Sequence, residues 1–168
     1  ALEKLGRGAA VVVTGQQPSV GYGALYNIHK AQAAIRFAQG IEARGVPCVA
    51  VFWNHSDDVR GGADVAFPDR GEPKLLEVGL PGVEEGKLLY EAGNAETLRM
   101  YSSVLTGALP GTEFAGWLSE LLGATHRGSI AESFSRLLLR TLGPYGLVVL
   151  EPRHLAGERS EALIRTHL

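Results

Sequence analysis

An apolar strand that leads into a polar, glycine-rich loop and then a helix is the feature that most narrows the possible fold of this chain. Residues Ala10 to Thr14 form a β-branched run of the kind found in buried strands, a loop with several glycines follows, and a helix is expected from Ala24 to about Arg44. Units of this order build parallel sheets, and such sheets bind their ligands where the strands end. The loop after Thr14 is therefore the first candidate binding site.

The sequence predicts further strands after this first unit. Val46 to Trp53 and Gly146 to Leu150 have the apolar composition of buried strands, whereas Asp64 to Pro68 and Lys74 to Leu80 are typical of a short hairpin. Helices with one apolar face are expected after Asn94, after Thr112 and from about Ser129 to Leu142. The sequence thus predicts an α/β fold, a Rossmann-like parallel sheet with helices on both faces and a small β-hairpin insertion.

Length and charge restrict the classes of function. At 168 residues, the chain is expected to form a single domain over residues 1–168. The net charge of −2 and the absence of clustered basic residues argue against nucleic acid as a partner, and no apolar run approaches the ~20 residues of a membrane span. Cys48 is the only cysteine, which fits a reducing compartment, and the first residues lack the plan of a signal peptide. A cytoplasmic protein is expected.

The last residues carry a helical pattern without a terminating signal. Ala162 to Leu168 contain no glycine or asparagine cap and no proline. We therefore expect the chain to be a fragment of a longer protein.

Two glycine patterns fall short of nucleotide-binding motifs. Gly21-Tyr22-Gly23 has two glycines of the dinucleotide fingerprint, but Tyr26 stands at the third position and the pair begins seven residues after Thr14. A nucleotide-dependent oxidoreductase is kept as an alternative on this pattern. Residues 82–88 lack the Ser or Thr that holds magnesium in a phosphate loop, and the histidines have no metal-binding spacing, so no metal site is predicted.

Polar residues follow two of the predicted strands. The first set follows Val13 and the second follows Trp53, and in a parallel sheet both sets emerge at the same edge. Glutamine amides can bind a polar substrate, a histidine can move protons near neutral pH, and paired aspartates can hold a cationic amine or magnesium. The candidates are Thr14, Gly15, Gln16, Gln17, Asn54, His55, Asp57 and Asp58.

Tyr26 and Lys30 lie one helical turn apart and belong to the same candidate set. They could face the site, or Tyr26 could pack in the core while Lys30 reaches solvent. Ordinary turn and surface roles remain an alternative for each residue of both loops.

At these residues the chain resembles the bacillithiol biosynthesis cysteine-adding enzymes. The resemblance is carried by Val12-Val13-Thr14-Gly15-Gln16-Gln17-Pro18, by the segment from Gly23 to Ala31, and by Val51-Phe52-Trp53. It continues in Phe134-Ser135-Arg136-Leu137-Leu138 and in the segment from Tyr145 to Pro152. It implies a core similar to nucleotidyltransferases and class I tRNA synthetases, followed by a coiled coil through which the full-length protein would form a homodimer.

The resemblance also implies a reaction, the joining of cysteine to glucosaminyl-malate through an amide bond. Thr14, Gly15 and Gln16 would then bind an anionic group, and Asp57 and Asp58 would orient the attacking amine. His55 is a candidate base. The cofactor is unknown, and ATP is a possible activator of the carboxyl group.

The chain departs from the family pattern at several positions. The family's acid-acid-His-acid run corresponds to Asp57-Asp58-Val59-Arg60, so valine stands at the position of the histidine. Ser19 replaces a glycine, Ala24 a proline and His29 an aromatic residue. A non-catalytic or degenerate homologue that binds a small anionic ligand is therefore kept as an alternative.

Overall fold

A parallel sheet of three strands forms the centre of the computed structural model, which describes residues 1–59, 64–68, 75–79, 81–82, 84, 86–108, 111 and 113–157. The strands are β1 (Ala10–Gln16), β2 (Cys48–Asn54) and β5 (Leu147–Leu150), with β2 in the middle. A separate antiparallel hairpin consists of β3 (Asp64–Pro68) and β4 (Leu75–Gly79). The predicted fold class, a Rossmann-like α/β sheet with a hairpin insertion, is confirmed.

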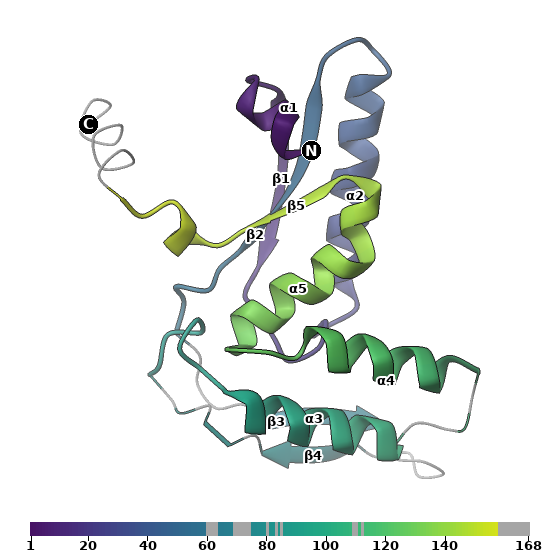
Figure 1. Ribbon diagram of the computed structural model, residues 1–168, viewed down its shortest axis with the longest axis vertical. Coiled ribbons are helices and arrows are strands. Elements are labelled where there is room, and N and C mark those ends of the chain that lie inside the picture. The colour runs from purple at the N-terminus through teal and green to yellow at the C-terminus, as the bar shows by residue number, and fades with distance from the viewer. Residues whose placement is uncertain are drawn as a thin grey trace.

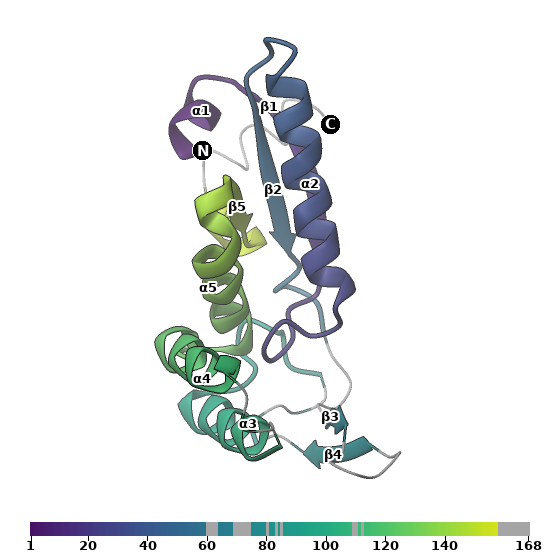
Figure 2. The ribbon, with the colours of Figure 1, turned by 90° about the vertical axis from the view of Figure 1, so that its right-hand side faces the viewer.

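The two long helices next to the sheet pack on the same face. Helix α2 (Tyr26–Glu42) follows β1, and α5 (Ile130–Leu142) precedes β5. In the view of Figure 2, α2 lies to the right of β2 and α5 to its left. Their apolar side chains form one core with the side chains of β2 that point toward them, and the rings of Phe52 and Phe134 are 5.8 Å apart between centroids. This core contains Ala31, Ala34, Ile35, Ala38, Cys48, Ala50, Phe52, Phe134, Leu138, Leu142 and Leu147.

Strand order explains why one face carries both helices. The chain moves from β1 to β2 and on to β5 without reversing direction across the sheet. Parallel connections are right-handed in nearly all proteins, so two successive connections in one direction put their helices on the same side. A helix that connects two parallel strands could lie on the opposite side only if the sheet had a strand beyond the free edge of β1.

The opposite face is only partly covered. Leu5 of the short helix α1 (Leu2–Gly6) packs against Val49, Val51 and Val148. Helices thus lie on both faces, as predicted, but unequally. The outward side chains of β1 are far from buried, since Val13 is 61% exposed. The expectation of a fully buried first strand is wrong here, because β1 is an edge strand and α1 packs over its neighbours.

A second group of helices lies beyond the carboxyl ends of β1 and β2. It consists of α3 (Ala95–Ala108) and α4 (Glu113–Thr125). Helix α3 lies next to both α4 and the β3–β4 hairpin (Figure 1). Val20, from the loop after β1, packs among residues of α3 and α4 and against Ile130. The loop between β1 and α2 is therefore anchored to the helical layer.

Most predicted boundaries agree with the structure to within two residues, and the cap residues are informative. Asn94 caps α3 by accepting hydrogen bonds from the amides of Glu96 (2.8 Å) and Thr97 (3.1 Å). Ser129 caps α5 in a capping box with Glu132. After α5, short 3-10 turns cover Gly143–Tyr145 and Pro152–His154. The cap predicted at Thr112 and the helix predicted over residues 162–168 lie outside the described residues.

Candidate functional site

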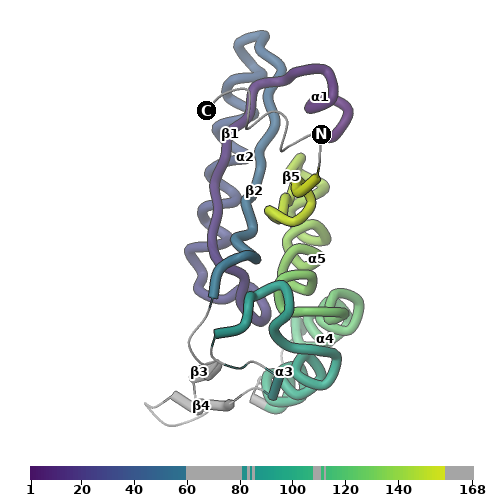
Figure 3. The backbone as a smooth tube through the Cα atoms, turned by 90° about the vertical axis from the view of Figure 1, so that its left-hand side faces the viewer, coloured from purple at the N-terminus to yellow at the C-terminus, as the bar shows by residue number. Residues whose placement is uncertain are grey.

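The two predicted polar loops meet at one edge of the sheet. Gln16 pairs with Asn54 at the end of the β1–β2 ladder, and the amide of His55 donates a hydrogen bond to the carbonyl of Gln16 at 3.1 Å. Figure 3 shows β1 and β2 side by side, with the chain leaving both at the same end. The edge predicted from strand order therefore brings both sets of candidates together.

The first strand is longer than predicted, and this changes the setting of Gly15. Gly15 and Gln16 are residues of β1 rather than of the loop, because the pairing with β2 continues as far as Asn54. A Cβ atom on Gly15 would lie 2.6 Å from the carbonyl oxygen of Trp53 and 3.2 Å from Nε2 of His55. The missing side chain of Gly15 thus allows β2 and His55 to approach closely.

Lys30 reaches from α2 to the end of β1. Its Nζ donates hydrogen bonds to the carbonyl of Gly15 (3.2 Å) and to Oε1 of Gln16 (2.9 Å), and it lies 5.1 Å from the ring centroid of Tyr26. Of the two alternatives for this pair, the structure favours the one in which both side chains face the site. The acceptors of Lys30 are neutral, and none of the ion pairs of the described residues involves it.

Asp58 connects the second loop to the first. Its Oδ2 accepts a hydrogen bond from Nε2 of Gln17, and its Oδ1 accepts one from the amide of Val59 at 2.8 Å. The Gln17 hydrogen bond, the Val59 amide and the nearby His55 hold the pKa of Asp58 below its usual value. Asp58 is therefore a fixed, ionised carboxylate at neutral pH.

His55 and Asp57 are exposed beside Asp58. The His55 ring meets the Trp53 ring edge to face, with 6.4 Å between centroids. Val59, at the position where the family pattern has histidine, is 51% exposed and forms an isolated bridge with Leu88. An exposed histidine and two exposed carboxylates thus share one loop, and the exposed Val59 directly follows them in the chain.

Asn54 is less accessible than the other candidates. Thr14, Gly15 and Gln16 are all half-buried within β1. Asn54 is fully buried, and its carboxamide donates to the carbonyl of Ala131 (3.1 Å) and to Oγ of Ser135 (2.8 Å). The predicted direct contact of Asn54 with a substrate disagrees with this geometry, since both amide hydrogens are used within the protein. Asn54 holds the end of β2 against α5 instead.

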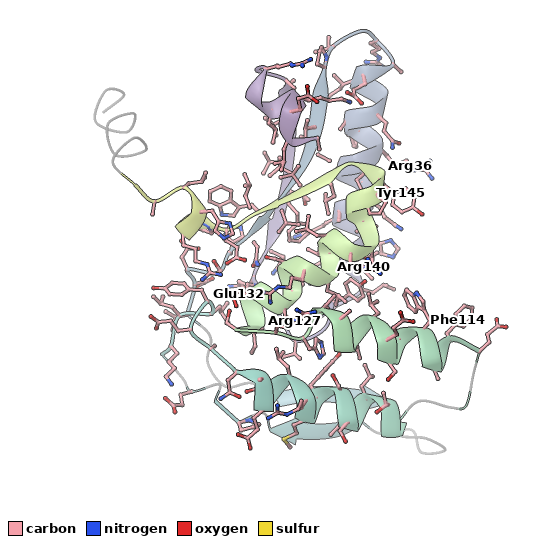
Figure 4. All side chains as sticks on the ribbon, in the orientation of Figure 1. Arg36, Phe114, Arg127, Glu132, Arg140 and Tyr145 are labelled. Atoms are coloured by element: carbon pink, nitrogen blue, oxygen red, sulfur yellow. The ribbon has the colours of Figure 1, made fainter. Side chains whose placement is uncertain are left out.

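Sequence reasoning assigned no role to the residues that hold Asn54. Ser135 donates a hydrogen bond to Oε1 of Glu151 at 2.8 Å, and Arg153 donates from Nε to Oε2 of the same carboxylate, also at 2.8 Å. Glu151 directly follows β5, so the rule that selected the ends of β1 and β2 would also have selected it. Figure 4 labels Glu132, the second carboxylate of Arg153, near the start of α5.

The glycines of the dinucleotide-like pattern have structural roles. Gly21 has a φ of +65°, and a Cβ there would collide with the Tyr101 hydroxyl. Gly23 has a φ of +61°, and a Cβ there would lie 2.8 Å from Oγ of Ser19. Both glycines are thus accounted for by the packing of the loop, which weakens the oxidoreductase alternative.

The described residues contain no group of three or more His, Cys, Asp or Glu side chains placed to hold a metal ion. Within the same residues, no helix has the length and apolarity needed to cross a bilayer. What the edge offers chemically is a lysine that forms no ion pair with another described residue, two glutamine amides, a histidine and two carboxylates.

Comparison with known proteins identifies the family. The sequence pattern described as "Bacillithiol biosynthesis BshC, N-terminal Rossmann-like domain" matches residues 1–162. A protein from Carboxydothermus hydrogenoformans, named "Putative cysteine ligase BshC", is 29% identical over 154 residues, which cover 89% of this chain and 29% of that protein. A protein of the same name from Heliobacterium modesticaldum is 33% identical over 156 residues, covering 84% of this chain and 27% of the relative.

A third protein of this name, from Koribacter versatilis, is 30% identical over 159 residues, which are 90% of this chain and 28% of the relative. The chain therefore spans less than a third of the length of these relatives. Its match to the family pattern covers nearly every residue, and its parallel sheet has the architecture that the pattern names. The chain belongs to the family of BshC N-terminal Rossmann-like domains of bacillithiol biosynthesis.

Proposed function

We propose that the protein containing this chain ligates cysteine to the amine of glucosaminyl-malate, the last step of bacillithiol biosynthesis. The family match over residues 1–162 is the observation that carries the proposal. The gathering of Gln16, Gln17, Lys30 and Asp58 at one sheet edge supports it. Because this chain covers less than a third of its relatives, the activity is proposed for the longer protein.

The proposed reaction makes two demands on the site. The cysteine carboxylate is a poor electrophile and has to be activated, and the attacking amine has to lose a proton. We propose ATP as the activator. The cysteine carboxylate would attack ATP to form an acyl adenylate with release of pyrophosphate, or an acyl phosphate with release of ADP, and the amine would then displace AMP or phosphate. Lys30 fits the phosphates of ATP, since its contacts are to the neutral oxygens of Gly15 and Gln16.

The end of β1 and the loop that follows it are proposed to bind the anionic part of the substrates. The start of α2 directs its backbone dipole toward the site, but a helix N-terminus contributes only ~0.3–1 kcal/mol. A full positive charge at Lys30 adds the stronger attraction, and the side chains of Gln16 and Thr14 provide hydrogen bonds. Residues of the longer protein would complete this binding site.

The second loop is proposed to handle the amine. Asp57 and Asp58 would attract the ammonium form of the amine, and the depressed pKa of Asp58 keeps that carboxylate charged at neutral pH. His55 is the proposed base, because it is exposed on the same loop and its ring lies beside Gly15. Cysteine and glucosaminyl-malate are thus the proposed partners, in a cytoplasmic homodimer.

Replacement of Gln16 by alanine tests the proposed anion site. In the longer protein, Gln16→Ala should change the unfolding free energy by no more than about 0.5 kcal/mol and should abolish the thermal shift caused by cysteine, glucosaminyl-malate or ATP. Gln39→Ala, at an exposed position near the other end of α2, is the control and should keep that shift. A large fall in melting temperature with ligand binding retained would show that Gln16 is structural.

A degenerate homologue that binds the substrates without ligating them is the second candidate, and Val59 is the observation that favours it. If the family reaction needs a base at this position, Val59→His should raise the ligation rate of the longer protein, within the ~10²–10⁴-fold range of acid–base catalysis. Position 59 is exposed and adjoins Asp58, so a histidine fits there.

The parent protein provides the control for this experiment. If it already ligates cysteine at a rate that Val59→His leaves unchanged, the degenerate reading fails and the proton is carried elsewhere. His55→Ala then decides the location. Loss of turnover with substrate binding intact would assign the base to His55, and unchanged turnover would place it outside this chain.

A further inference from the structure

A buried chain of hydrogen bonds connects the end of β2 to the end of β5. It starts at the Asn54 carboxamide, which is 0% exposed, and passes to Oγ of Ser135 at 2.8 Å. Ser135 then donates to Oε1 of Glu151, also at 2.8 Å. Since Ser135 belongs to α5, this path ties two strand ends to each other through the helix that covers them.

The same carboxylate continues the path to the surface. Oε2 of Glu151 accepts from Nε of Arg153, and Nη2 of Arg153 donates to Oε1 of Glu132 at 3.1 Å. The Arg153 guanidinium also lies 5.8 Å from the ring centroid of Tyr90. Both oxygens of Glu151 are thus paired, and its only charged partner among the described residues is Arg153.

Tyr90 connects Arg153 to the loop that carries the proposed amine-binding groups. Its amide donates to the carbonyl of Ser56 at 2.9 Å, and the amide of Leu89 donates to the carbonyl of Asp58 at 3.0 Å. The segment from 54 to 58 is therefore held at its start through Asn54 and on its backbone through Leu89 and Tyr90. Glu151 lies between these two attachments.

The free energy of folding alone gives little reason to bury Glu151 and pair it with Arg153. The Glu151 side chain is 2% exposed, and burying a carboxylate with its partner is often no better for stability than a packed apolar pair. In this network the Ser135 hydroxyl and both oxygens of Glu151 are paired, whereas Oδ1 of Asn54 has no hydrogen-bond partner among the described residues. Paired buried polar groups favour one geometry over others. Reaction rates are sensitive to such geometry, because a displacement of about 1 Å can cost a factor of about 10².

We propose that Glu151 is a positioning residue of the candidate site, which acts through Ser135 and Arg153 to fix the segment that carries His55, Asp57 and Asp58. The expected effect of Glu151 on the ligation rate rests on the proposed ligase function. Its expected effect on the conformation of residues 54–58 does not.

Hydrogen exchange of individual amides in the longer protein tests the positioning directly. The variants are Ser135→Ala, which cuts the path to Asn54, and Glu151→Gln, which keeps an acceptor for Ser135 but removes the charge facing Arg153. Ser133→Ala is the matched control, because Ser133 lies on the same helix, is 1% exposed and has a hydroxyl without a hydrogen-bond partner among the described residues.

The amides of Leu89 and Tyr90 should exchange at least about ten-fold faster in Ser135→Ala and in Glu151→Gln, relative to amides in the middle of β2. Ser133→Ala should leave this ratio unchanged. If the exchange of all amides rises by one common factor, the network only adds global stability and the proposal is overturned. If Ser133→Ala has the same local effect as Ser135→Ala, the proposal is overturned as well.

Steady-state kinetics of cysteine ligation give the second readout. In Ser135→Ala and Glu151→Gln, kcat should fall by about 10- to 100-fold while KM for cysteine changes by less than about two-fold. A rise in KM with kcat retained would contradict positioning of the reacting groups. A parent protein that does not ligate cysteine refutes the proposed function alone, and the exchange ratio of the Leu89 and Tyr90 amides still decides whether Glu151 positions the segment.

Discussion

Replacing Gly15 with alanine should destabilise the protein, and the close approach of β2 to this residue sets the size of the effect. The added Cβ would lie 2.6 Å from the carbonyl oxygen of Trp53, 3.0 Å from Cβ of Trp53 and 3.2 Å from Nε2 of His55. His55 can rotate away, but the Trp53 carbonyl belongs to the backbone of the central strand. The two strands therefore have to separate locally.

Forcing extra atoms into a packed site usually costs about 1–3 kcal/mol, and the contact with backbone places Gly15→Ala toward the upper end of that range. Gly40→Ala is the matched control. Gly40 lies in α2 with no atom within 4 Å of an added Cβ, so alanine there should stabilise the helix by about 0.5–1 kcal/mol. The two glycine-to-alanine changes are thus expected to have opposite signs.

Urea denaturation of both variants and the parent measures these differences. The result also separates two roles of Gly15. If the glycine served only to bring bare backbone close to a bound anion, Gly15→Ala would lower ligand affinity and leave stability unchanged. A Gly15→Ala variant as stable as the parent would refute the packing argument.

Further predictions concern the core between α5 and the sheet and a half-buried histidine. Phe134→Ala should cost about 3–5 kcal/mol in urea denaturation, because Phe134 is 0% exposed between α5 and the sheet, whereas Phe37→Ala, at a side chain that is 69% exposed, should stay within about 0.5 kcal/mol. Burial lowers the pKa of His126 below its ordinary value of 6.5, although a hydrogen bond with the Leu98 backbone opposes this shift. As pH falls, the His126 imidazole therefore becomes protonated in the unfolded chain before it does in the folded protein, so the free energy of unfolding should decrease below pH 6.5. His126→Gln should reduce this decrease, as measured by comparing urea denaturation midpoints at neutral pH and at about pH 5.

The order of strands and helices could be predicted because its signals are local. The apolar run of β2 and the Ser129 cap each lie within a few residues of the element that they define. Lys30 could be placed near the first loop for a similar reason, since it lies in the first turns of the helix that follows that loop. The extension of β1 through Gln16 depends instead on pairing with Asn54, a contact between residues far apart in the chain.

The sequence could not predict which residues at the end of β2 are exposed to solvent. Side chains alternate between the two faces of a strand, so Asn54 shares the side of Phe52 and packs toward α5, whereas His55 is exposed. The side of β2 that carries Val49 and Val51 is just as apolar as the side that carries Phe52. Composition therefore gives no indication of which side α5 will cover.

That choice depends on a helix distant in sequence. Ser135, which binds the Asn54 carboxamide, is 81 residues further along the chain, and the carbonyl of Ala131 is 77 residues away. The strand-end rule predicted that the candidates lie at one edge of the sheet, where the structure has them, but it could not divide them into exposed side chains and side chains that hold the loop. Whether a side chain faces α5 determines to which of these groups it belongs. Because Asn54 faces α5, it links the loop that carries Asp57 and Asp58 to the buried Glu151.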